Sequence, residues 1–200
     1  MSFFEPKPPS KPREPLPEVA PWLQQPRWIL GGTVGIRVVL ATTPTMAVLA
    51  HGFTAYPEGV HFEVDMRPRA RFARGDEELD LHQVLHPEYK DGDLSPTFFR
   101  FGIEFEDGTK LTNLMDEESR RALRDSDAPP DRPVLLVQGG GGAGHEFSAR
   151  FWLWPLPGGA HLDLVCEWPA FGIPVSRARV ETAPIVAATA RARPYLGRGS

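Results

Sequence analysis

Apolar and polar side chains alternate with a period of two along much of this chain, and this pattern constrains the fold more than any other feature. The clearest run is residues 60–67, where Val, Phe and Met alternate with His, Arg and acidic residues. Residues 36–40 and 99–105 repeat the alternation. Successive side chains of a β-strand point to opposite faces of its sheet, so each run predicts a strand with one buried side.

Segments of this kind give about seven or eight strands with little helix between them. We therefore expect a mainly β fold, an antiparallel sandwich of the immunoglobulin-like or jelly-roll type. A short C-terminal helix is expected after Thr182, which is placed as its N-cap, with Pro184 in the first turn. The chain of 200 residues suits one domain plus a tail.

Residues 1–27 contain eight prolines and are predicted to form a disordered, proline-rich arm ahead of a β-sandwich domain at 28–196. The PxxP spacings in this arm fit either a docking peptide or an ordinary solvated tether. Trp22 and Trp28 near its end are expected to pin the arm to the domain.

The turn after residues 99–105 predicts a definite strand register. Glu106-Asp107-Gly108 suits a three-residue hairpin loop with Gly108 in a left-handed conformation. This loop sets Ile103 opposite Leu111, and it sets the two flanking charged residues opposite each other. A two-residue loop would instead set a phenylalanine against a lysine, so the three-residue loop is favoured.

Residues 145–168 are predicted to form a second hairpin, with residues 155–160 as the loop and Trp154 paired with His161. Every pair on one face of this hairpin is then apolar, including Phe151 with Leu164. The other face is amphipathic. The predicted hairpin gives the sharpest division between a buried and an exposed side in the whole chain.

The outward face of this predicted hairpin is the candidate binding site. It consists of Trp152, Trp154, Arg150, His161 and Asp163. Exposed tryptophans rimmed by charges suit sugar stacking or a protein-binding hot spot, so the expected partner is a protein or a glycan. The alternative is that the C-terminal helix or the Trp22/Trp28 region covers these rings, because large aromatic side chains are usually buried.

Charge and cysteine content exclude several classes of protein. The net charge of −4 gives no basic excess for nucleic-acid binding. Cys166 is the only cysteine, so an intrachain disulfide and a zinc site with two or more cysteines are excluded. Residues 5–17 interrupt any signal peptide, and Arg37 interrupts the apolar residues 29–53, so no membrane span is expected. These features favour a cytoplasmic protein.

No catalytic or cofactor motif stands out, and neither a cofactor nor a bound metal is predicted. Residues 139–144 are rich in glycine but lack the lysine and hydroxyl of a phosphate loop. His82 and His86 have the i,i+4 spacing of metal ligands, with Glu88 nearby. Gln83 stands where the glutamate of an HExxH motif would lie, and a proline follows directly after His86.

The segments GFTAYPEGVHFEV, FGIEFEDGTKLTNL and GGGGAGHEFSARFWLWPLP resemble a family of β-rich proteins from high-GC bacteria to which no activity is assigned. The resemblance covers residues 30–195 and implies a β-rich single domain, but it carries over no functional residue. From the residues themselves we expect a non-enzymatic binding or scaffolding module that acts through the exposed aromatic sheet face. The alternative is a small metal-dependent jelly-roll enzyme with a His/Glu cluster.

Overall fold

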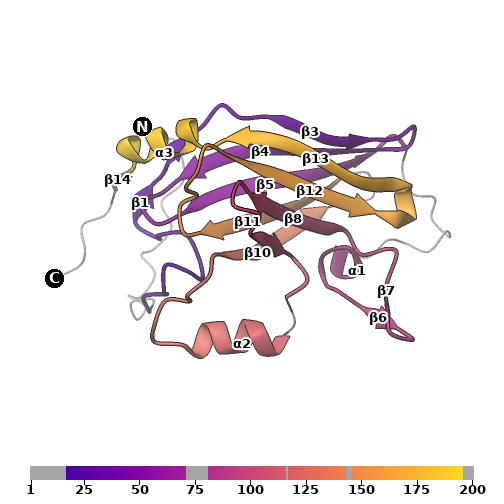
Figure 1. Cartoon of the computed structure of the whole chain (residues 1–200), viewed down its shortest axis with the longest axis horizontal. Helices are drawn as coiled ribbons and strands as arrows, with labels where there is room; N and C mark the ends of the chain where they lie inside the picture. Colours follow the sequence, from indigo (N-terminus) through magenta and orange to yellow (C-terminus); the bar gives the residue numbers. More distant parts are fainter. Residues whose placement is uncertain (1–16, 71–80, 116, 143–145, 196–200) are drawn as a thin grey trace, which may run out of the picture.

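Two antiparallel sheets form the body of the protein (Figure 1). The computed structural model describes residues 17–70, 81–115, 117–142 and 146–195. The larger sheet contains, in spatial order, β10 (Val134–Gly142), β11 (Phe147–Trp154), β5 (Val60–Pro68) and β4 (Met46–Ala55). Two short strands, β2 (Gly32–Thr33) and β3 (Val38–Thr42), each pair with β4. The smaller sheet has the order β13 (Ile173–Glu181), β12 (His161–Trp168), β8 (Arg100–Phe105) and β9 (Lys110–Thr112).

Shorter elements surround these sheets. They are the strand pairs β1 (Ile29–Leu30) with β14 (Arg193–Pro194) and β6 (Tyr89–Lys90) with β7 (Asp93–Leu94), the helices α1 (Leu81–Leu85), α2 (Glu117–Asp125) and α3 (Ala183–Ala188), and the 3-10 turns η1 (Pro169–Phe171) and η2 (Thr189–Arg191). The mainly β fold with antiparallel sheets and a short C-terminal helix is therefore confirmed. The finer choice between an immunoglobulin-like and a jelly-roll sandwich stays a prediction.

A single hydrophobic core fills the space between the inner faces of the two sheets. Its centre is a group of phenylalanine rings in which Phe62 stacks on Phe53 at 5.1 Å and on Phe151 at 5.5 Å. Phe101 of the smaller sheet reaches across to Phe151, with ring centroids 4.5 Å apart. Each fully buried side chain of this size contributes about 1.5–3 kcal/mol to folding, so the core holds the two sheets face to face.

The predicted register of the β8–β9 hairpin is confirmed. Ile103 pairs with Leu111, and Glu104 pairs with Lys110. Gly108 has φ +83°, the left-handed conformation that the three-residue loop requires. Local turn chemistry was therefore sufficient to fix which residues of this hairpin face each other.

The predicted hairpin of residues 145–168 is wrong. Strand β11 pairs with β10 and β5 in the larger sheet, whereas β12 pairs with β13 and β8 in the smaller one. Phe151 and Leu164 are both fully buried, as the alternation predicted. They enter the shared core from opposite sheets and are not paired within one sheet. A two-residue period shows which side of a strand is buried and does not show which strand lies beside it.

Part of the predicted disordered arm is packed against the larger sheet. Trp22 is 7% exposed and its indole N–H donates to the Leu123 carbonyl at 3.2 Å. The side-chain amide of Gln138 donates to the Leu23 carbonyl at 2.7 Å. The expected anchoring of the arm to the domain through Trp22 is therefore confirmed, while residues 1–16 lie outside the described part of the chain.

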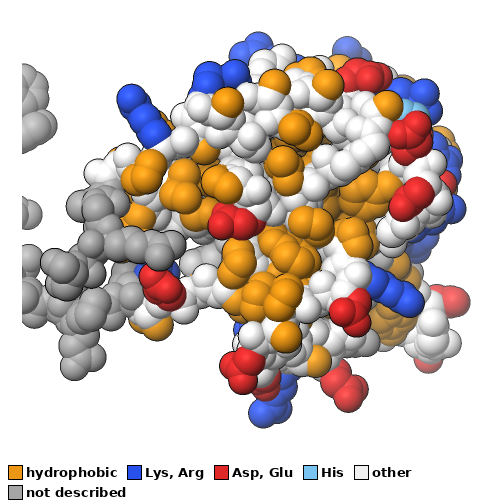
Figure 2. Space-filling model, turned by 60° about the vertical axis from the view of Figure 1, so that its left-hand side comes forward, with side chains coloured by type: hydrophobic (Ala, Val, Ile, Leu, Met, Phe, Trp, Pro, Cys, Tyr) orange, Lys and Arg blue, Asp and Glu red, His pale blue; other side chains and the backbone are white. Residues whose placement is uncertain are grey.

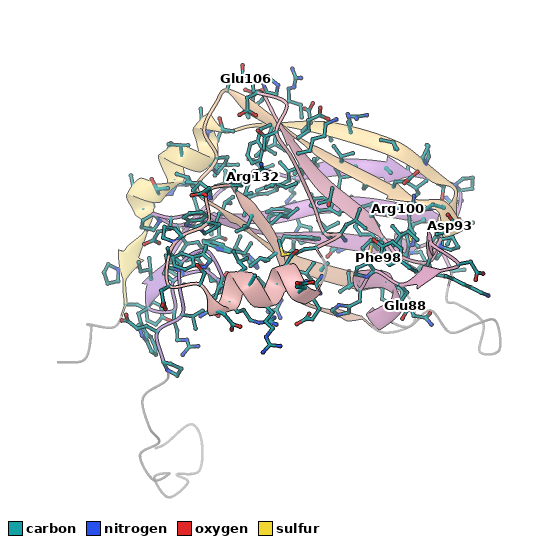
Figure 3. All side chains as sticks on the ribbon, turned by 60° about the horizontal axis from the view of Figure 1, so that its bottom comes forward. Glu88, Asp93, Phe98, Arg100, Glu106 and Arg132 are labelled. Atoms are coloured by element: carbon teal, nitrogen blue, oxygen red, sulfur yellow. The ribbon has the colours of Figure 1, made fainter. Side chains whose placement is uncertain are left out.

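The segment around residues 88–100 is tied to the end of the smaller sheet. Arg100, at the start of β8, donates to the Leu94 carbonyl at 3.5 Å, and the Trp168 indole donates to the Thr97 carbonyl at 2.9 Å. Figure 3 shows Arg100 close to this segment and Glu106 at the opposite end of the strand.

The helices in the described part of the chain are all too short or too polar to span a membrane.

Candidate functional site

The candidate aromatic pair of β11 lies on the outer face of the larger sheet, but this face is covered. Trp152 is 0% exposed, its indole N–H donates to the Pro21 carbonyl at 3.0 Å, and Tyr56 contacts it edge-on at 5.8 Å. Trp154 is half-buried, with the Trp22 ring 6.3 Å away. The expected exposure of these rings is wrong, and the alternative, coverage by the Trp22 region, is what the structure contains.

The other three candidate residues are divided between two sheets. Arg150 lies on β11 and pairs with Glu63 of β5 in the larger sheet. His161 and Asp163 lie on β12 in the smaller sheet, where an Asp163 carboxylate oxygen lies 3.2 Å from Nε of Arg179. The five residues therefore do not form one surface. They were grouped by assuming that β11 and β12 are neighbours, and these strands belong to different sheets.

An exposed aromatic pair does occur, at one end of the sandwich. Trp28 is 43% exposed and is the only exposed member of the five tryptophans. Tyr195 is 58% exposed, and its ring lies 6.3 Å from that of Trp28 at an interplanar angle of 68°. Leu30 of β1 and Val186 of α3 are also exposed, and both elements lie at this end of the molecule (Figure 1). Together, Trp28, Leu30, Val186 and Tyr195 are called the end patch below.

The end patch is created by the meeting of the N-terminal and C-terminal segments. Strands β1 and β14 pair through Leu30 and Arg193, and the Tyr195 amide donates to the Trp28 carbonyl at 3.1 Å. The Tyr195 hydroxyl donates to the Arg27 carbonyl. Figure 2, which brings this end forward, shows hydrophobic side chains gathered over much of the surface. Backbone pairing thus holds apolar side chains from both ends of the chain in water.

A shallow hollow of about 560 Å³ opens beside the end patch. Its lining includes Gln24, Arg27, Leu30, Tyr56 and Tyr195. One guanidinium nitrogen of Arg27, Nη1, is buried without a hydrogen-bond partner in the described structure. Burial raises the pKa of Tyr56, with a smaller contribution from Tyr195, so its hydroxyl stays protonated at neutral pH. The lining of the hollow therefore combines polar and apolar side chains.

A cluster of charged residues occupies another part of the larger sheet's outer face. His51 Nε2 lies 2.9 Å from Asp65 Oδ2, and Nη2 of Arg67 lies 2.7 Å from the same oxygen. Arg67 also lies 3.0 Å from Glu146. Glu63, opposite His51 in the β4–β5 register, completes the group. His51, Glu63 and Asp65 are called the outer-face triad below.

Asp65 is unusual because it points outward and is nevertheless buried, its side chain being 5% exposed. Burial by itself would raise its pKa. The interactions with His51, Arg67 and Ser148 outweigh that effect, so the pKa of Asp65 is lowered from its ordinary value. Asp65 is therefore an ionised carboxylate at neutral pH.

The residues of the outer-face triad could hold a metal ion. Its three potential ligand atoms all lie within 4.8 Å of one another. The side chain of His82 lies outside the described part of the structure, so the predicted grouping of His82 with His86 and Glu88 stays a prediction. The buried Cys166 has a pKa raised to about 12 by burial and is a core residue rather than a ligand or nucleophile.

Sequence reasoning missed the triad because a β-bulge brings it together. In β4 the buried side chains are Met46, Val48 and Ala50, and after the bulge they are Phe53 and Ala55. The bulge includes Gly52, which has φ +66°. It is this shift that leaves His51 outward and opposite Glu63. The change from even to odd apolar positions around His51-Gly52 was the signal in the sequence.

Compared with protein-family models, with curated proteins and with solved structures, the chain matches none. The functional argument therefore depends on the surfaces of this protein alone.

Proposed function

We infer that this protein is a non-enzymatic binding module that engages a partner protein through the end patch. The observation that carries this inference is the exposure of Trp28. The other tryptophans are buried or half-buried, and three of their indole N–H groups donate to the carbonyls of Pro21, Thr97 and Leu123. Exposed Trp and Tyr side chains next to Arg are typical of the residues that dominate protein–protein binding energy.

The shape of the end patch favours a protein over a glycan. Sugar rings stack on flat aromatic faces, and the Trp28 and Tyr195 rings are inclined at 68°, so they provide no common platform. Leu30 and Val186 extend the surface with aliphatic groups, which suit apolar side chains of a protein. The adjoining hollow is lined by Gln24 and Arg27, whose polar side chains suit polar groups of a partner protein.

The test compares the double variant Trp28→Ala/Tyr195→Ala with Tyr89→Ala. Tyr89 is 64% exposed on the distant β6 strand, so it is a matched control for loss of a surface aromatic. A partner recovered from source cells with the wild-type chain is purified and titrated against all three proteins. We expect the double variant to lose at least about 2 kcal/mol of binding free energy, as hot-spot truncations do, and the control to bind normally.

Fluorescence supplies a second, independent measurement. Trp28 is the exposed tryptophan, so acrylamide should quench its emission preferentially, and Trp28→Phe should remove most of the quenchable signal. Binding of the partner should protect Trp28 from acrylamide. A partner that binds the double variant with wild-type affinity, or leaves Trp28 open to the quencher, would show that the end patch is not the binding surface.

A further inference from the structure

We propose that the outer-face triad binds one divalent metal ion, with His51, Glu63 and Asp65 as ligands and Zn²⁺ or Mn²⁺ as the class of ion. This site lies on the outer face of the larger sheet and is separate from the end patch. One imidazole nitrogen and two carboxylates form a mixed donor set, because imidazole suits Zn²⁺ and carboxylate oxygen suits Mn²⁺. The outer-face triad is drawn from two adjacent strands, so its backbone is held by the sheet ladder.

The spacing of the ligand atoms fits a single ion. Metal–ligand distances for His nitrogen and carboxylate oxygen are about 2.1 Å, so two ligands at right angles are about 3.0 Å apart. The distance of 2.9 Å between His51 Nε2 and Asp65 Oδ2 agrees with such a pair. Opposite ligands of an octahedral ion would be about 4.2 Å apart, and all three triad atoms lie within 4.8 Å of one another.

His51 turns Nε2 toward the carboxylate of Asp65. Its Nε2 atom is buried and has no hydrogen-bond partner in the described structure, although Asp65 is only 2.9 Å away. The contact with Asp65 is close enough to lower the pKa of that carboxyl, but its geometry falls short of a well-aligned hydrogen bond. Buried polar nitrogen atoms normally find a partner, and a metal ion between the two groups would supply one.

Arg67 is the competing occupant of the cluster. Its guanidinium lies 2.7 Å from Asp65, the same carboxylate that the ion would use. The Arg67 side chain is 53% exposed and is also held by Glu146 at 3.0 Å, so it can keep that second partner when Asp65 turns to an ion. The alternative is a polar network in which Arg67 and His51 satisfy Asp65 and no metal binds.

Calorimetric titration of the full-length, chelator-treated chain with Zn²⁺ alone and then Mn²⁺ alone at neutral pH tests the proposal. We expect one ion per chain. His51→Ala and Glu63→Gln should each weaken binding by at least about tenfold, since even residues behind metal ligands change affinity by this much. The matched control is His161→Ala, which removes an imidazole from β12 in the smaller sheet and should bind normally.

Two further measurements keep the test decisive. Circular dichroism checks that each variant is folded. If His51→Ala does not fold, the titration of Glu63→Gln decides the test. In nuclear magnetic resonance spectra, Mn²⁺ should broaden amide signals of Ala50, Val64 and Ser148, which surround the triad. The absence of saturable binding, binding unchanged in both triad variants, or broadening centred on the smaller sheet would overturn the proposal.

Arg67→Ala provides the sharpest distinction from an ion-pair network. Removal of the competing guanidinium should make Zn²⁺ binding several-fold tighter, because Asp65 is then free for the metal. A weaker affinity in this variant would overturn the assignment of Asp65 as a ligand.

Discussion

The outer faces of the two sheets have the same alternating sequence pattern but very different environments. On the smaller sheet, outward charges form surface ion pairs such as Arg100–Glu167 at 2.6 Å and Arg177–Glu104 at 3.5 Å. These four side chains are 28–52% exposed. On the larger sheet, outward-pointing Trp152 is 0% exposed and the Asp65 side chain is 5% exposed.

The difference arises from contacts that are distant in sequence. The carbonyls of Pro21 and Leu23 accept hydrogen bonds from Trp152 of β11 and Gln138 of β10, so this segment lies over the outer face of the larger sheet. Asp65 lies on a central strand, with His51 contributed by β4 and Ser148 by β11. Outward direction therefore does not mean exposure, and the larger sheet is where outward residues affect stability and binding most.

The largest expected effect is at Trp152. Trp152→Ala should destabilise the protein by about 3–5 kcal/mol because it removes a fully buried indole. Val165→Ala, at an outward and half-buried position of β12, should cost about 1 kcal/mol. Urea unfolding at neutral pH measures both changes. Equal costs for the two substitutions would mean that the covering segment contributes little.

A smaller contrast is expected between two aspartates. Asp65→Asn should destabilise the fold by about 1–3 kcal/mol, because a buried carboxylate loses charge-assisted interactions with His51 and Arg67. Asp163→Asn breaks the exposed pair with Arg179 and should cost less than about 1 kcal/mol. The same denaturation experiment decides, and a larger cost at Asp163 would reverse the comparison of the two faces.

The contribution of Asp65 should also depend on pH in a definite direction. Its pKa is lowered in the folded state, so its ionisation stabilises the fold above the unfolded-state value of about 3.9. This stability is lost as pH falls through the folded-state pKa. The difference in unfolding free energy between wild type and Asp65→Asn should therefore shrink below about pH 4. A difference that stays constant down to pH 2 would contradict this.

The smallest effect is expected at Glu104 on the smaller sheet. It lies 3.4 Å from Lys110 and 3.5 Å from Arg177, both largely exposed to solvent. Glu104→Gln should change stability by less than about 0.5 kcal/mol, because exposed ion pairs gain little over hydrated charges. Thermal unfolding at low and high salt checks this, and a strong salt dependence would indicate that the surface pairs act together.

The sequence by itself determined the local features of this protein. Alternation identified the buried sides of β5, β8, β11 and β12, and the chemistry of the Glu106-Asp107-Gly108 loop fixed the register of its hairpin. These features depend on backbone geometry over a few residues, and the residues concerned are adjacent in the chain.

Tertiary structure alone decided the neighbours. It separated β11 from β12 and covered Trp152 with the segment around Pro21. It also left Trp28 beside Tyr195 in solvent and, through the bulge at Gly52, set His51 opposite Glu63. The alternating pattern of two strands is the same whether they are neighbours in one sheet or lie in two sheets that face each other across the core. The choice depends on how the whole chain packs, which no local pattern records.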